Sequence, residues 1–267
     1  MKQIIPKRSK KVIFTSLAVI LSVIVLSGSI FGYLYVSTPE HIRNPQLEHY
    51  HFRTQIIVDG NLVDFSKDEF QQETPGTCSA EVSGTPIDFH DNQDQMTHIH
   101  WDGITGGEFL KYYGWNYIGG ASNILGFRYD DGLMRMHQVT HYGDLLPYVP
   151  EGSNFYVYIG DKDGYEQKPW EDFLQQDLEE FFGKKSNLSQ DEQASLLDKL
   201  FFPKAYAHGK VIDDHEEKSD KTEEELARIS NLIGNVVIFV QKDEPTKDQI
   251  QERFENLVPL HDSTCGG

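Results

Sequence analysis

The residues best able to do chemistry in this sequence are histidines spaced two apart. They form two His-x-His pairs, His49 with His51 and His98 with His100. On a β-strand, residues i and i+2 point to the same face about 6.5–7 Å apart, so each pair can direct two imidazoles toward one ion. An imidazole nitrogen binds zinc at about 2 Å and also suits copper, nickel and iron. The pairs therefore favour a transition-metal site, with zinc or copper as the expected ion.

Histidines are concentrated in one stretch of the chain. Five of the eleven, the two pairs and His90, fall between residues 49 and 100. Asp91 follows His90 and could orient its ring as an outer hydrogen-bond acceptor. If the two strands are neighbours, all four paired rings share one face, and the two pairs should lie within about 8 Å of each other. The alternative is histidines that are scattered over two faces, or that are each bonded to a backbone carbonyl.

Sulfur donors offer further possibilities. Cys78 and Cys265 could form a disulfide in an oxidising exterior, or remain two free thiols, and Cys78 could instead be a soft ligand near the histidines. Met134, Met136 and His137 suggest copper(I), although methionine in a hairpin more often serves packing.

Two other functional classes are open. A dense aromatic group could form a stacking platform for an envelope partner, although core lining is the favoured interpretation; it comprises Trp101, Tyr112, Tyr113, Trp115 and Tyr117. A metal-dependent enzyme would need an open coordination position and a nearby acid or base, for which Asp91, Asp102 and Glu108 are the candidates. Nucleophile-elbow, phosphate-loop and dinucleotide motifs are absent from the sequence, and the catalytic residues stay unknown.

The N-terminal segment predicts a membrane anchor. Residues 12–36 form an uncharged run of 25 residues, and five basic residues precede it. That length crosses a hydrocarbon core of about 30 Å with some tilt. The flanking charges place the N-terminus in the cytoplasm and the rest outside, so we expect a single-pass protein of the cell membrane. A cleaved signal peptide is the alternative, but its apolar stretch usually spans only about 7–15 residues.

The body that follows this segment is strongly acidic. Its 231 residues carry 19 basic against 42 acidic side chains, a net charge of −23. A nucleic-acid-binding protein would present a basic face, so this class is excluded. The acidic surface favours the approach of cations.

Hydrophobic periodicity and turn signals predict an α+β fold. Strands are expected at 52–58, 62–65, 96–101, 154–160 and 235–241, a hairpin at 124–139, and helices at 106–113, 170–182, 189–201, 222–233 and 246–257. We divide the chain into residues 1–36 for the N-terminus and membrane helix, a β-rich histidine-cluster unit at 37–160, and a more helical α+β unit at 161–267 packed on it.

Two stretches of the sequence resemble a family of membrane-anchored extracytoplasmic proteins from small-genome bacteria and archaea. They are HYHFRTQIIVDGNLVDF at 49–65 and DFHDNQDQMTHIHWDGITGGEFLKYYGWN at 88–116, and Cys78 lies between them. That family has paired His-x-His motifs, and no activity is established for it. The resemblance covers about 70 of the 267 residues and implies metal binding. Where the family pattern has a fuller His-x-His-Asp, this chain has FHDN around His90.

The topology can be tested through the C-terminal cysteine. We expect Cys265 to react with a membrane-impermeant thiol reagent on intact cells after reduction, because the positive charges hold residues 2–11 inside. Labelling that occurs only after lysis would contradict the assignment.

Overall fold

The computed structural model describes residues 7–37, 39–43, 46–71, 86–89, 94–115, 145–184 and 221–260. The elements, in chain order, are α1 (Lys7–Ser37), α2 (Glu40–Arg43), β1 (Leu47–Val58), β2 (Asn61–Leu62), β3 (Ile87–Asp88), β4 (Met96–Trp101), α3 (Gly106–Tyr112), β5 (Asn154–Asp161), β6 (Gly164–Lys168), α4 (Trp170–Gln175), α5 (Leu178–Phe182), α7 (Glu223–Ile229), β7 (Leu232–Gln241) and α8 (Lys247–Glu255).

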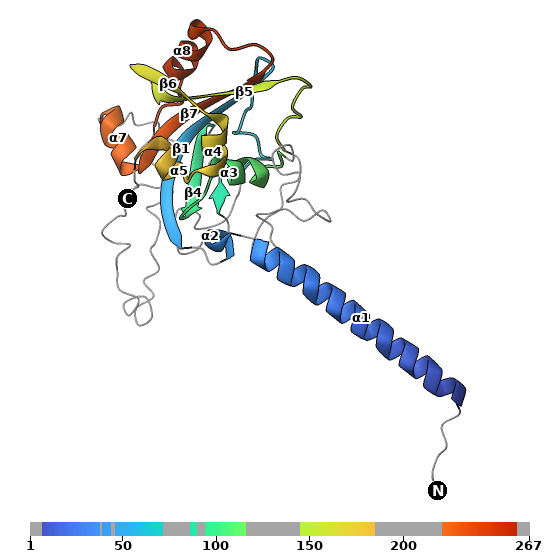
Figure 1. Cartoon of the computed structure of the whole chain (residues 1–267). Helices are drawn as coiled ribbons and strands as arrows, with labels where there is room; N and C mark the ends of the chain where they lie inside the picture. Colours follow the sequence, from blue (N-terminus) through green and yellow to red (C-terminus); the bar gives the residue numbers. More distant parts are fainter. Residues whose placement is uncertain are drawn as a thin grey trace, which may run out of the picture.

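Helix α1 projects away from the body (Figure 1). Its apolar side chains are exposed along most of its length. Residues Val12–Tyr33 are long and apolar enough to cross a membrane, and none of the window that passes this test is buried in the structure. An exposed apolar helix of this kind is unfavourable in water and suits a bilayer. A signal sequence near an N-terminus has the same character.

One seven-stranded mixed sheet forms the centre of the body. Its strand order is β3-β4-β1-β7-β5-β6, with the short β2 also paired to β1. β1 runs antiparallel to β4 and parallel to β7, and β7 runs antiparallel to β5. The α+β class is therefore confirmed. The sheet takes strands from both sides of residue 160, because the C-terminal strand β7 lies between β1 and β5.

Side-chain alternation along the strands divides the core into two layers. One face of the sheet carries Tyr50, Phe52 and Ile56 of β1, which pack in a large apolar cluster with side chains of α3, α4 and α5. The opposite face is covered by the C-terminal helices: Ile57 of β1 packs in a cluster with α8, and Met96 of β4 packs in one with α7. β1 is thus covered on both faces.

Three of the helices begin at a threonine cap. Thr105, Thr222 and Thr246 each accept a hydrogen bond at the start of α3, α7 and α8, and all three form complete capping boxes. The predicted helix over 170–182 is divided into α4 and α5, because the Asp177 side chain starts a second helix by capping the backbone N–H of Glu179. The predicted helix at 189–201 and hairpin at 124–139 lie outside the described residues.

Two glycines let α3 and α4 approach closely. A Cβ built on Gly106 or Gly107 would lie 2.5 Å from the backbone oxygen of Phe173 or Leu174, respectively. Such a contact is shorter than van der Waals packing allows, and a backbone atom cannot rotate aside. This helix pair therefore requires glycine at both positions.

We expect Gly107→Ala to destabilise the body by about 1–3 kcal/mol, the usual effect of overpacking. The gain in helix propensity of up to about 1 kcal/mol offsets only part of this. Urea unfolding of the detergent-solubilised protein, followed by tryptophan fluorescence, measures the change. Gly164→Ala is the matched control, since a Cβ there meets nothing within 4 Å. Equal stability of the two variants would contradict the packing argument.

A histidine joins the short helix α2 to the body. His41 Nε2 lies 2.8 Å and 3.0 Å from the two carboxylate oxygens of Glu108, which is nearly buried and also caps α3. Burial lowers the pKa of His41, but the hydrogen bond and negative charge of Glu108, with the nearby Asp102 and Asp177, outweigh it and raise the pKa above 6.5.

A raised pKa in the folded state means that this pair stabilises the protein fully below about pH 6.5 and loses its effect as pH rises through the folded pKa. We expect Glu108→Gln, which can still cap α3, to reduce the free energy of unfolding by about 1 kcal/mol at pH 5.5 and by less at pH 9. Urea titrations at the two pH values measure this difference. A loss that is the same at both pH values would show that the charge of His41 does not contribute.

Candidate metal centre

Strands β1 and β4 bring the two His-x-His pairs together. His51 and His98 are directly opposite each other in the antiparallel register, so their side chains point to the same face. His49 and His100 lie on that face too, two residues away along each strand. The pairing has a register irregularity between Leu47 and Tyr50, the segment that contains His49. The prediction that the two histidine strands are adjacent is confirmed.

The four rings form one cluster. Ring centroids are separated by 4.3 Å for His51 and His98, 4.8 Å for His49 and His51, 5.4 Å for His49 and His100, and 6.4 Å for His49 and His98. All of these separations are below the limit of about 8 Å for a shared site. The alternative of histidines scattered over two faces is therefore wrong for these four.

Three of the histidines could hold a metal ion together. Within the described part of the chain, donor atoms of His49, His98 and His100 lie within 4.8 Å of one another. Nitrogen ligands at about 2.0–2.1 Å from a tetrahedral ion would be about 3.4 Å apart, so small side-chain rotations would complete the geometry. His98 and His100 are fully buried, whereas His49 is half-buried.

His51 takes part through hydrogen bonds. Its Nδ1 is bonded to the backbone carbonyl of Ser230, in the turn that follows α7, and its Nε2 lies 2.8 Å from Nδ1 of His98. The Asn231 side chain also donates to the backbone carbonyl of His49. The histidine cluster is therefore tied to the end of α7, about 180 residues away along the chain.

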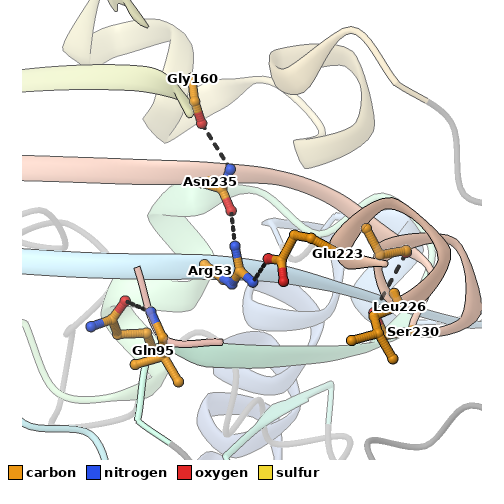
Figure 2. A network of polar contacts seen from close by, with 9 residues as sticks. Arg53, Gln95, Gly160, Glu223, Leu226, Ser230 and Asn235 are labelled. Carbon is orange, nitrogen blue, oxygen red and sulfur yellow. Dashed lines mark hydrogen bonds and ion pairs between the residues drawn. The ribbon is translucent and has the colours of Figure 1, made fainter. Parts of the chain in front are cut away.

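A second polar contact holds α7 against this face of β1. Arg53, two residues beyond His51, is bonded to the Glu223 carboxylate at the start of α7 and lies 3.4 Å from the Asn235 side chain (Figure 2). Asn235 in turn donates to the carbonyl of Gly160. α7 is thus attached to β1 at both ends, by Arg53 at its start and by His51 after its end.

One site residue was missed from the sequence. Asp88 of β3 pairs in register with His98, and its Oδ2 lies 3.7 Å from Nε2 of His100, with both side chains fully buried. A carboxylate beside a ligating histidine is a common outer contact at metal sites. The sequence did contain one signal for this residue, because Asp88 is a lone acidic residue between the apolar Ile87 and Phe89. Such a residue indicates that one face of the strand has polar surroundings.

Several sequence candidates do not meet at the cluster. Glu108 is engaged with His41 and the start of α3, and Asp102 is exposed. Four members of the aromatic group, Trp101, Tyr112, Tyr113 and Trp115, are at most 2% exposed, so they line the core and do not form a surface platform. Outside the described residues lie His90, Asp91, Cys78, Cys265, Met134, Met136, His137 and Tyr117.

Comparisons with protein-family models, curated proteins and solved structures find no match for this chain. The functional argument therefore depends on the chemistry of the site.

Proposed function

We propose that this protein binds a transition metal ion, zinc or copper, in an extracytoplasmic body attached to the membrane through residues 12–36. The observation that carries the proposal is the convergence of three imidazole donors, from His49, His98 and His100, in a largely buried cluster. Neutral imidazole is a favoured ligand for Zn²⁺ and Cu²⁺, whereas Cu⁺ prefers sulfur.

The surroundings of the cluster support cation binding. The body outside residues 1–36 has a net charge of −23, which favours the approach of cations. The buried carboxylate of Asp88 beside His100 would partly offset the charge of a divalent ion. Such a protein would serve metal uptake, metal delivery or a metal-stabilised fold outside the cytoplasm.

A metal-dependent enzyme is the second candidate. Three protein ligands are the usual number at catalytic zinc sites, because the fourth position holds water or substrate. The three imidazoles of His49, His98 and His100 would leave such a position for water or substrate. The hypothesis of an envelope-docking module without metal loses support, because the four described members of the predicted aromatic group are buried.

The proposal predicts about one zinc or copper ion per chain in full-length protein purified in detergent and analysed by elemental spectrometry. His98→Ala/His100→Ala should reduce the metal content to background. His41→Ala, which removes a histidine outside the cluster, should retain it. A wild-type protein that takes up neither ion from a buffered excess would overturn the proposal.

Acid should release the ion, because a protonated imidazole cannot coordinate a metal. We expect the affinity for Zn²⁺, measured by competition with a chromophoric chelator, to fall steeply below about pH 6.5. The His41→Ala variant should show the same profile. An affinity that does not change between pH 7.5 and 5.5 would exclude histidine ligands.

A further inference from the structure

We infer that His51 and Asp88 are positioning residues that set which ring nitrogen His98 and His100 present to the ion: Nε2 of His98 and Nδ1 of His100. This inference rests on the proposed metal-binding function, but its central claim concerns hydrogen positions that exist without metal. It changes the role of His51 from the predicted ligand to a residue that orients another ligand.

The first step follows from the Ser230 carbonyl. A carbonyl oxygen can only accept a hydrogen bond, so Nδ1 of His51 must be the donor in this contact. In a neutral imidazole one nitrogen donates and the other accepts. His51 Nε2 is then an acceptor, and the group 2.8 Å away, Nδ1 of His98, must donate to it.

The second step transfers this assignment to His98. A neutral His98 that carries its hydrogen on Nδ1 has its lone pair on Nε2. Only a nitrogen with a lone pair can bind a metal, so His98 would coordinate through Nε2. The backbone carbonyl of Ser230 therefore selects the ligand atom of a side chain that it does not touch.

Asp88 likewise favours one tautomer of His100. Its Oδ2 lies 3.7 Å from Nε2 of His100, and both side chains are fully buried. This distance is longer than a direct hydrogen bond, so the carboxylate acts through its negative charge, which is poorly screened in a buried position. The charge favours hydrogen on Nε2, which leaves the lone pair on Nδ1.

The two ligands therefore use different nitrogens. Residues i and i+2 project side by side from β4, and the opposite tautomers would let both rings address one point between the strands. Outer-shell partners of this kind typically contribute 10–100-fold to metal affinity by fixing ring orientation and raising ligand basicity.

Tautomers can be read in the metal-free protein. In full-length chain labelled with [15N]histidine and held in detergent micelles, long-range ¹H–¹⁵N spectra distinguish Nδ1–H from Nε2–H rings, with assignments from single histidine substitutions. We expect His98 as Nδ1–H and His100 as Nε2–H. Adding Zn²⁺ should shift the Nε2 signal of His98 and the Nδ1 signal of His100. The opposite tautomer at His98 would overturn the inference.

Substitutions supply the second readout. His51→Gln should keep zinc affinity within a few-fold of wild type, because the Gln carbonyl oxygen can accept from His98, whereas His51→Phe should weaken it about 10–100-fold. Asp88→Asn should weaken it by a similar factor and retain about one ion per chain. Equal zinc affinities for the Gln and Phe variants would overturn the positioning role of His51. Loss of stoichiometric zinc binding in Asp88→Asn would show that the carboxylate is itself a ligand and would overturn the positioning role of Asp88.

The two proposals fail differently. Absence of zinc uptake by wild-type protein overturns the proposed function, and the tautomers then report the orienting contacts alone. Zinc uptake with the opposite tautomer at His98, or with no difference between the two His51 variants, overturns the further inference and leaves the metal site in place.

Discussion

The structure depends on the burial of a polar face of β1. Polar side chains alternate along this central strand, with His51, Arg53 and Gln55 all at most 4% exposed. A buried polar group without a partner costs about 1–3 kcal/mol, so the elements that cover this face must supply hydrogen bonds as well as apolar packing. Ser230 supplies one to His51, Glu223 and Asn235 contact Arg53, and the carbonyl of Arg253 accepts from Gln55. The C-terminal helices are therefore attached to β1 by specific polar contacts.

This constraint also explains why the cluster lies where it does. The other face of β1 carries Tyr50, Phe52 and Ile56 in the largest apolar core, where an imidazole group would be difficult to satisfy. On the polar face, β4 contributes His98 opposite His51, and β3 contributes Asp88 opposite His98. The histidines thus satisfy part of one another's hydrogen-bonding capacity in the interior. A site built on paired strands in this way holds its donors more rigidly than one built on loops.

Local patterns predicted the parts of the fold that local physics decides. The period of two placed each histidine pair on one face, and hydrophobic periodicity with turn signals located the helices α3, α7 and α8. Tertiary structure decided the rest. The predicted helix at 222–233 ends at Ile229, because residues from Leu232 onward pair with β1 and β5. Parallel pairing between strands about 180 residues apart leaves no short-range signal, so neither the position of β7 nor the Ser230–His51 contact could be predicted.

The roles of two acidic residues could not be predicted either, because they depend on long-range contacts. Asp88 reaches His100 only because β3 and β4 pair, and Glu108 meets His41 only because α2 folds back onto α3. Sequence spacing could suggest Glu108 as a helix residue but not as the partner of a histidine 67 positions earlier. The partners of such charged groups depend on which strands and helices pack together, and the spacing of residues along the sequence does not show this.

The same topology would link the proposed metal binding to folding. The donors come from β1 and β4, and the contact that orients His98 through His51 comes from the turn after α7. An ion that binds only when these three segments are assembled stabilises the folded state by about 2.7 kcal/mol at a free concentration 100 times its dissociation constant. That gain is a large fraction of the stability of a typical domain. Because α7 is also held by Arg53 and Glu223, binding at the cluster would strengthen the attachment of the C-terminal elements to the strand that follows the apolar N-terminal helix.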